Sequence, residues 1–395
     1  MRPPSPNGAG AAAPQPEMTP PDPATGPGGP VLVLNAGSSS LKARLLAPDD
    51  AVLWQGSTGW DATGGGEGPG VDEVLGEWLA PALEPWRSGM ALAGHRVVHG
   101  GERFTAPTRL TPEVLAELEA LVPLAPLHNG PALQVMRHLA VQWPNLPQWA
   151  CFDTAFHATL PAAARTYALP EAWRALGLRR FGFHGLNHQH VAETVSRRFG
   201  TTRPDTGRGD GPLRLISCHL GAGCSLCAIA GGRSIATTMG FTPLEGLVMA
   251  RRSGSVDPGL LLQLLRLGVA PAELDRVLNG ESGLLGLSGL SGDMRELRAA
   301  EASGHVGAAL ALAVFRFTLL QAIGAMAASL GGVDVIALTG GIGEHDGQLR
   351  VELVEALAWL GPCELIVVPA DEEGQIARSC RAATSCSPPA CPPPS

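Results

Sequence analysis

The chain has 395 residues, of which 45% are hydrophobic and 16% charged, as is typical of a soluble globular protein large enough for two domains. Its formal net charge is −8. This charge argues against a nucleic-acid-binding surface, because neutralising phosphates requires clustered lysine and arginine. Any anionic ligand must therefore be met by basic groups placed locally.

The two ends of the chain are poor in residues that could form a core. Residues 1–30 are mostly proline, glycine and alanine, so we expect a disordered extension with its start at either Met1 or Met18. They lack the basic start and apolar centre of a secretion signal. From residue 381 the composition is again of the unstructured type, and we assign 386–395 to a disordered tail. We expect a cytoplasmic protein.

The first predicted element is VLVLNAGSSSLKARLL at residues 31–46, an apolar strand, a serine-rich turn and a second strand. The turn, NAGSSSLK, does not fit the P-loop pattern G-x-x-x-x-G-K-[ST], because it has one glycine and its lysine ends the segment. Serine-rich turns are often only hydrogen-bonded turns. Alone, the segment leaves a phosphate site and a plain turn as alternatives.

Further along the chain, Thr111 and Pro112 supply a cap and a first-turn proline for a helix with the sequence EVLAELEALV. Residues 201–212 are predicted to form a surface loop. Four polar segments stand out: GHRVVHGGERF (94–104), CFDTAFHATLP (151–161), RRFGFHGLNHQHVA (179–192) and MGFTPLEGLVMARRSGSVDPG (239–259).

Each of these segments also has an ordinary interpretation. Lone histidines are more often core or surface residues than catalysts, and the pair Arg251 and Arg252 is typical of a solvated face. His184 and His188 have i, i+4 spacing, but no glutamate follows as in H-E-x-x-H, so the spacing does not favour a metal site. Asp153 directly follows a predicted strand.

The strand–turn–strand pattern occurs a second time, at LRLISCHLGAGCSLCAIAGG, residues 213–232. A third glycine turn follows a strand in VIALTGGIGEHD near residue 335. Backbone N–H groups in such turns form concave anion sites. The repetition predicts a duplicated α/β domain in which two hairpins clasp a polyphosphate across a cleft.

Two apolar features have structural interpretations. Cys224 and Cys227 form a C-x-x-C inside an apolar run without a second pair, which favours buried free thiols over a metal or redox site. Residues 308–332 are the longest apolar stretch. Arg316 and Gln321 interrupt it, so a buried or dimer-facing helix fits better than a membrane span.

Taken together, these strings resemble the acetate kinase family over about residues 31–380. The blocks, in order, are NAGSSSLK, GHRVVHGGE, FDTAFH, GFHG, MGFTPLEGL with RSG and VDP, GGIGE and PADEEGQIAR. The resemblance implies the fold of the sugar kinase, Hsc70 and actin superfamily, with two ribonuclease H-like α/β domains around a nucleotide cleft. We assign residues 31–153 and about 374–385 to the first domain, and 154–373 to the second.

The resemblance also implies roles for individual residues. Asp153, His184 and Arg252 match catalytic positions, and Asn35 and Glu372 match magnesium-linked ones. The carboxylate substrate and its acyl group correspond to Arg96, Val98, Leu127, Phe183 and Pro243. The nucleotide site corresponds to Ser38, Ser40, Lys42, His219, Leu220, Gly221, Ala222, Gly223, Asp293, Met294, Arg295, Gly341, Ile342, Gly343, Glu344 and His345.

The implied activity is reversible transfer of the γ-phosphoryl group of ATP to acetate, with Mg²⁺ (or Mn²⁺ in its place) and ATP or ADP as substrate. The family is typically homodimeric, and no nucleic-acid or membrane partner is implied. A propionate or butyrate kinase is the alternative in the same class. A nucleotide-binding module of the actin or Hsc70 type is a more distant alternative, which the paired arginines argue against.

At three positions the residue differs from the one that is usual in the family. Ala222 and His345 stand where asparagine is usual, and Ala236 stands where an aspartate is usual. These changes weaken the polar detail expected of the nucleotide site. We expect Ala222 to leave the backbone N–H groups of Gly221 and Gly223 available for phosphate.

Overall fold

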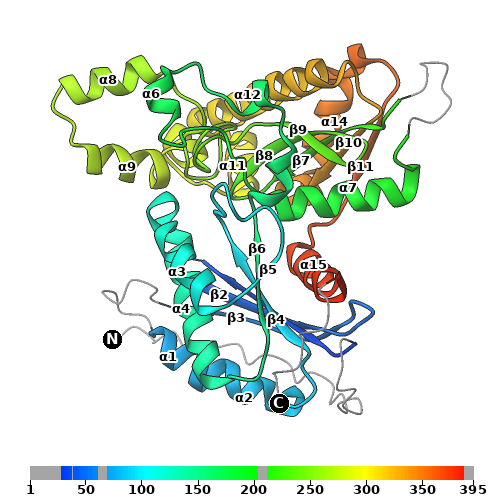
Figure 1. Cartoon of the computed structure of the whole chain (residues 1–395). Coiled ribbons are helices and arrows are strands. Elements are labelled where there is room, and N and C mark those ends of the chain that lie inside the picture. Colours follow the sequence, from blue (N-terminus) through cyan, green and yellow to red (C-terminus); the bar gives the residue numbers. More distant parts are fainter. Residues whose placement is uncertain (1–27, 38, 61–68, 203–210, 387–395) are drawn as a thin grey trace, which may run out of the picture.

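The computed structural model describes residues 28–37, 39–60, 69–202 and 211–386, except for the side chains of Leu127 and Cys386. The predicted extension up to residue 27, Ser38, most of the loop at 201–212 and the tail from residue 387 lie outside the described residues. The described chain forms two α/β lobes, each built on one sheet (Figure 1).

The first sheet has six strands in the order β3-β2-β1-β4-β6-β5. Strands β1, β2 and β3 are antiparallel neighbours, whereas β4 and β6 run parallel to β1. The predicted hairpin at 31–46 is confirmed as β1 and β2. The strands are β1 (Val31–Ala36), β2 (Ser40–Leu46), β3 (Val52–Gly59), β4 (Leu92–Val97), β5 (Thr108–Arg109) and β6 (Gln148–Phe152).

The second sheet has five strands in the order β11-β10-β7-β8-β9. Again three antiparallel strands, β7 to β9, stand beside two parallel ones. The sheets therefore repeat one topology, as the duplicated hairpin predicted. The strands are β7 (Arg214–Leu220), β8 (Cys224–Ala230), β9 (Arg233–Thr237), β10 (Val335–Thr339) and β11 (Glu364–Val367).

Alternate residues of the central strand β1 face opposite layers, as the two-residue period of a strand requires. Leu32 and Leu34 pack in the core shared with α4, whereas Val31 and Val33 pack against α15. Both faces are covered, which explains why VLVL is apolar throughout.

Helices cover both sheets. The first lobe has α1 (Val71–Glu73), a π turn (Val74–Leu79), α2 (Ala80–Leu83), α3 (Pro112–Ala120) and α4 (Pro126–Gln142), with 3-10 turns at Glu84–Trp86 and Val122–Leu124. The second has α5 (Ala162–Arg165), α6 (Glu171–Arg174), α7 (Gly185–Phe199), α8 (Pro258–Arg266), α9 (Pro271–Gly280), α10 (Gly283–Ser288), α11 (Met294–Ala302), α12 (Val306–Leu330), α13 (Gly340–His345) and α14 (Gly347–Ala356), with 3-10 turns at Ala155–Thr159 and Ala358–Leu360.

Several local predictions are tested by these elements. The Thr111 side chain accepts a hydrogen bond from Val114 N, so the predicted cap of α3 is confirmed. Cys224 and Cys227 are buried and free. The third glycine turn is wrong in detail, because GGIGEH coils into α13. Glu344 holds this start by accepting from Gly340 N at 3.0 Å.

Helix α12 contains the apolar stretch predicted to be helical. Among the described residues it is the one helix whose length and composition would allow it to cross a membrane. It packs against α10, α11 and β8. Ala308, Ala311 and Phe315 from this helix belong to the core of the second lobe, as expected of a buried helix.

The last helix, α15 (Glu372–Cys386), returns from the second lobe to the first sheet (Figure 1). Our prediction of unstructured chain from residue 381 is therefore wrong for 381–386. Arg381 holds this end of the helix by donating to Asp50 at 2.7 Å and to the carbonyls of Leu46 and Ala47. Composition alone did not reveal these anchors.

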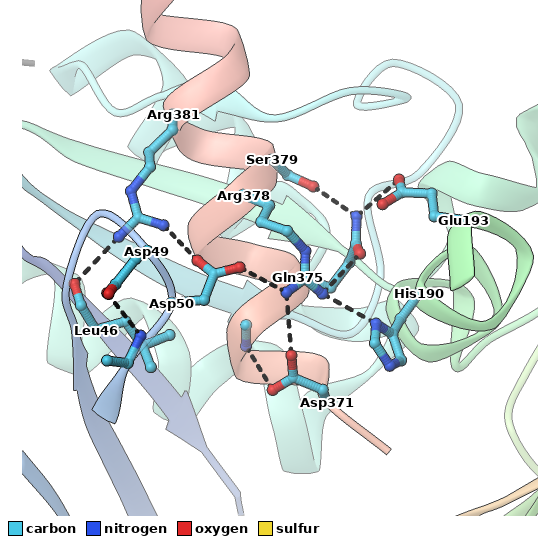
Figure 2. Close-up of polar contacts among 12 residues, drawn as sticks. Leu46, Asp49, Asp50, His190, Glu193, Asp371, Gln375, Arg378, Ser379 and Arg381 are labelled. Atoms are coloured by element: carbon cyan, nitrogen blue, oxygen red, sulfur yellow. Dashed lines mark hydrogen bonds and ion pairs between the residues drawn. The ribbon is translucent and has the colours of Figure 1, made fainter. Parts of the chain in front are cut away.

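Figure 2 shows that α15 also ties the lobes together. Arg378 donates to Asp50 in the β2–β3 turn at 2.9 Å and to His190 of α7, also at 2.9 Å. Gln375 donates to Glu193 of α7 at 3.1 Å. One helix is thus bonded both to a turn of the first sheet and to a helix of the second lobe.

Candidate active site

A cavity of about 470 Å³ lies where the two lobes meet. The β1–β2 turn and the β7–β8 turn both contribute to it, as the hairpin argument predicted. Many predicted site residues line the cavity: Asn35, Ser40, Lys42, Arg96, Val98, Asp153, Phe183, His184, His219, Ala222, Gly223, Pro243, Arg252, Gly341 and Glu372.

Other predicted residues are not among the described residues that line this cavity. Ser38 and the Leu127 side chain lie outside the described residues. Asp293 caps α11 and pairs with the exposed Arg295, beside Met294. The remaining predicted nucleotide residues lie at the end of β7, in the second turn or on α13: Leu220, Gly221, Ile342, Gly343, Glu344 and His345.

The ends of β4 and β6 build a compact charged cluster. Arg96 donates to Asp153 from Nε at 3.2 Å and from Nη2 at 2.7 Å, and its Nη1 lies 2.9 Å from Glu372 of α15. Burial opposes the charge on Arg96, but the two carboxylates hold its pKa above the usual range. Burial raises the pKa of Asp153 to about 6, despite the contact with Arg96.

His184 occupies a strained position between glycines. Its φ of 56° lies in the left-handed region, which is uncommon for a residue with a side chain. The next residue, Gly185, donates to the Asp153 carbonyl at 2.8 Å, and a Cβ there would lie 2.1 Å from that oxygen. Only glycine fits this approach, which ties the His184 loop to Asp153.

Two histidine rings stack beside the cavity. The rings of His184 and His219 have centroids 4.2 Å apart. Burial, together with His219 and Arg96, lowers the pKa of His184 well below its usual range. His184 is therefore neutral near pH 7, and Asn187 Nδ2 lies 2.8 Å from Nδ1 of His219.

Arg252 reaches the cavity from the loop before α8. Its Nη1 donates to the Pro243 carbonyl at 3.1 Å, and burial lowers the pKa of the guanidinium. The preceding arginine, Arg251, is exposed. The pair therefore combines one residue of the cavity and one of the surface.

The second turn departs from our expectation at one atom. Gly221 N donates to Gly223 O at 3.0 Å within the turn, so its N–H is not available to a phosphate as predicted. Of the three unusual residues, Ala222 lines the cavity. Ala236 lies on β9 against the core, and His345 is exposed at the end of α13.

Sequence reasoning missed several residues of the cavity. His128 lines it beside the arginines, and burial with Arg252 and Arg96 lowers its pKa to about 4. Its signal was the polar pair His128 and Asn129 in an otherwise apolar helix start. Other missed lining residues are Ala36, Gly37, Gly340, Ala370 and Glu373.

The oxygen groups of the cavity suit a hard cation. Asn35, Asp153, Glu372 and Glu373 all line it. The described residues contain no group of three or more His, Cys, Asp or Glu side chains able to hold a metal. Mg²⁺ is usually held by one or two carboxylates together with substrate phosphates. The donor set fits a magnesium ion shared with a nucleotide.

Comparisons with known proteins agree with this geometry. The profile of the Acetokinase family matches residues 67–380. An acetate kinase of Synechococcus sp. (strain JA-2-3B'a(2-13)) is 41% identical over 402 residues, covering 89% of this chain and 98% of the relative. The acetate kinase of Deinococcus radiodurans is 47% identical over 350 residues, covering 84% and 86%.

Solved structures give the same result. The structure of Porphyromonas gingivalis acetate kinase superposes with a TM-score of 0.79 at 34% identity, covering 89% of this chain and 98% of that one. A propionate kinase from Francisella tularensis subsp. tularensis SCHU S4 superposes with a TM-score of 0.80 at 31% identity, with the same coverage.

Proposed function

Because the chain belongs to the acetokinase family, we propose that it reversibly transfers the γ-phosphoryl group of ATP to acetate, giving acetyl phosphate and ADP. The observation that carries this proposal is the convergence of Arg96, Arg252, neutral His184 and a small apolar patch on one cavity. Such a set suits a small carboxylic acid next to a phosphoryl group.

The residue types match the demands of the reaction. A carboxylate is already ionised at pH 7, so it needs no strong general base to act as nucleophile. Phosphoryl transfer instead needs two anions held in line and their charge neutralised. Arg252 and His184 supply N–H groups on the second lobe, whereas Arg96 is held at the end of β4.

The carboxylates have a separate role. In the proposed site, Asn35 and Glu372 hold Mg²⁺ with the nucleotide phosphates, and the ion neutralises charge on the transferred group. Asp153 orients the Arg96 guanidinium by accepting hydrogen bonds from its Nε and Nη2, and it faces the same cavity. Lys42 and Ser40 meet phosphate at the first turn. Asp293 to Arg295 and Gly341 to His345 surround the adenosine.

The apolar residues of the cavity are assigned to the acyl group of the acid. Val98, Phe183 and Pro243 line the same cavity as Arg252. Propionate kinase is the alternative, because one solved neighbour carries that name. The curated relatives described above are named acetate kinase, so acetate remains the leading substrate.

A substrate panel tests the proposal. The purified chain is incubated with ATP, Mg²⁺, hydroxylamine and either acetate, propionate, butyrate or no acid, and acyl hydroxamate is measured. Acetate should give the highest kcat/KM, and chelation of Mg²⁺ should abolish the product. A preference for propionate would replace acetate as substrate. ATP hydrolysis without any hydroxamate would instead support a nucleotide-binding module of the actin or Hsc70 type.

We further propose that the chain is a cytoplasmic homodimer. Helices α8 and α9 project from the second lobe, and α8 exposes Leu260, Leu262 and Leu265 (Figure 1). A second copy of the chain would bury this apolar face. Light scattering coupled to size-exclusion chromatography gives the mass directly, and Leu262→Glu should convert a dimer to a monomer.

A further inference from the structure

Four buried polar side chains form a continuous chain from β7 to the cavity. Ser217 Oγ of β7 lies 2.8 Å from Nδ1 of His188 on α7. Nε2 of His188 lies 2.8 Å from Ser225 Oγ on β8, and Ser225 Oγ lies 3.0 Å from Nδ1 of His184. His184 is the member that reaches the cavity.

This hydrogen-bonded chain has no further partner among the described residues at its Ser217 end, and it reaches the cavity at its His184 end. Ser217, His188 and Ser225 are completely buried. Within the described part of the protein, their hydroxyl and ring nitrogen atoms form hydrogen bonds only with one another and with His184. Nε2 of His184 lies near Gly223, where an added Cβ would be 3.1 Å away, and Gly223 lines the cavity.

Both histidines are neutral, so each ring has one N–H and one lone pair. Burial lowers the pKa of His184 and of His188 well below the usual range. The position of each proton must then be decided by the hydrogen bonds. A buried N–H or O–H without an acceptor costs about 1–3 kcal/mol.

In one arrangement of the protons, every buried hydroxyl and N–H of Ser217, His188 and Ser225 donates to another member of the hydrogen-bonded chain. Ser217 donates to His188 Nδ1, His188 Nε2–H donates to Ser225, and Ser225 donates to His184 Nδ1. In the reverse arrangement the Ser217 hydroxyl has no acceptor. If both histidines donate to Ser225, its own hydroxyl has none. The first arrangement alone satisfies all buried donors and leaves the N–H of His184 on Nε2.

We propose that Ser217, His188 and Ser225 are positioning residues that hold His184 as the neutral tautomer with its proton on Nε2. An N–H then faces the phosphoryl group, where a lone pair would repel its oxygens. This inference rests on the proposed function for its meaning, but the tautomer itself is a property of the free protein.

Nitrogen-15 NMR of histidine-labelled, ligand-free protein reads the tautomer directly. His184→Gln and His188→Gln identify the two ring signals by their loss. We expect both rings in the wild type to carry the proton on Nε2. In Ser225→Ala, His184 loses the bond to Nδ1, so its signals should shift towards a mixture of tautomers. A wild-type His184 or His188 with its proton on Nδ1 overturns the proposal.

Kinetics with a matched control separates positioning from stability. Ser234 is equally buried and lies 2.9 Å from Nδ1 of His157, whose other nitrogen lies 3.0 Å from the Phe183 carbonyl. Ser225→Ala and Ser234→Ala therefore each remove a buried hydroxyl that bonds a histidine, although Ser225 bonds two histidines and Ser234 bonds His157 and the Cys227 thiol. Ser225→Ala should lower kcat about tenfold with KM for ATP nearly unchanged, because a donor to transferred charge is misplaced. Ser234→Ala should keep kcat within about twofold, since its histidine does not line the cavity.

The possible outcomes are distinct. A larger kcat loss in Ser225→Ala at equal melting temperature supports the proposal, and restoration by Ser225→Thr, which keeps the hydroxyl, strengthens it. Equal losses in both alanine variants overturn it, because stability alone would then explain them. A wild-type protein that makes no acyl phosphate refutes the proposed function, while the NMR result still decides the tautomer.

Discussion

The two walls of the cavity carry their charges in opposite ways. On the first-lobe wall, Arg96 is bonded to Asp153 and lies 2.9 Å from Glu372, so its charge is matched by carboxylates. On the second-lobe wall, Arg252 donates to the Pro243 carbonyl, and no carboxylate of the described residues lies within ion-pair distance of it. Both arginines are charged, but carboxylates balance the charge of Arg96 on the first wall, whereas no carboxylate of the described residues balances that of Arg252 on the second.

This difference separates the binding tasks in the proposed site. The first wall, with its excess of carboxylate oxygen, suits a cation, whereas the second wall suits an anion. Placing opposite charges on facing walls draws a metal–nucleotide complex into one orientation. The four predictions below test this asymmetry, beginning with the largest effect.

The largest effect should follow the loss of Arg252 or His184 from the second-lobe wall. Arg252→Ala and His184→Ala should each lower kcat by about 10²-fold or more, because their N–H groups meet charge that grows in the transition state. ATP binding, measured by calorimetry, should change far less. Arg251→Ala removes the exposed neighbour and serves as control, with kcat near wild type. Near wild-type turnover in either cavity variant would refute the assigned roles.

The first wall should make the activity of the enzyme depend on pH in the acidic range. Burial raises the pKa of Asp153 to about 6, above the unfolded value near 3.9, so the native state binds the extra proton between these values. Stability from this group therefore falls as pH rises through that window. Activity changes the opposite way, because the ionised carboxylate orients Arg96.

We expect kcat to fall about tenfold between pH 7 and pH 5, because about nine tenths of the group is ionised one pH unit above its pKa and about a tenth one pH unit below it. Asp153→Glu should keep an acid limb and Asp153→Asn should lose it at lower activity. A limb that survives in Asp153→Asn would assign it to another group.

Giving the second turn a polar side chain should make the walls more alike. Ala222 is exposed and lines the cavity, so an asparagine there has room. Its amide would donate to a phosphate oxygen, a bond worth about 1.5–3 kcal/mol. We predict that Ala222→Asn raises kcat/KM for ATP about tenfold. An unchanged or reduced value in steady-state kinetics would show that the turn is adapted to alanine.

The smallest effect concerns the apolar patch between the walls. Val98→Ala should narrow the preference for acetate over propionate by several-fold, because one methylene in an apolar pocket is worth about 1–3 kcal/mol. The ratio of the two kcat/KM values measures it, and KM for ATP should stay constant. A ratio that does not move would place the acyl group elsewhere in the cavity.

The sequence predicted the local elements that have strong patterns. The hairpins of β1–β2 and β7–β8 follow from apolar runs joined by small polar turns, and their repetition predicted the duplicated fold. The meeting of Asn35, Arg96, His184 and Arg252 around one cavity follows from the same duplication together with the family resemblance. Their individual roles remain predictions.

Other features depend on contacts that no local pattern encodes. The approach of Glu372 to Arg96 joins residues from opposite ends of the chain. The helix through residue 386 depends on Arg381 finding Asp50 in a distant turn. The hydrogen bond from Gly221 N to Gly223 O depends on the geometry of the turn, which a glycine-rich sequence does not determine.

Helix α15 also has a consequence for how the protein is made. Val31, Val33 and Leu92 of the first sheet are covered by Ile376, Ala377 and Cys380. On the ribosome the chain emerges from its N-terminus, so the lobe begun first is completed last. The elements of the second lobe have all been synthesised before α15 leaves the exit tunnel. Until α15 has been made, the nascent chain carries an uncovered apolar sheet face.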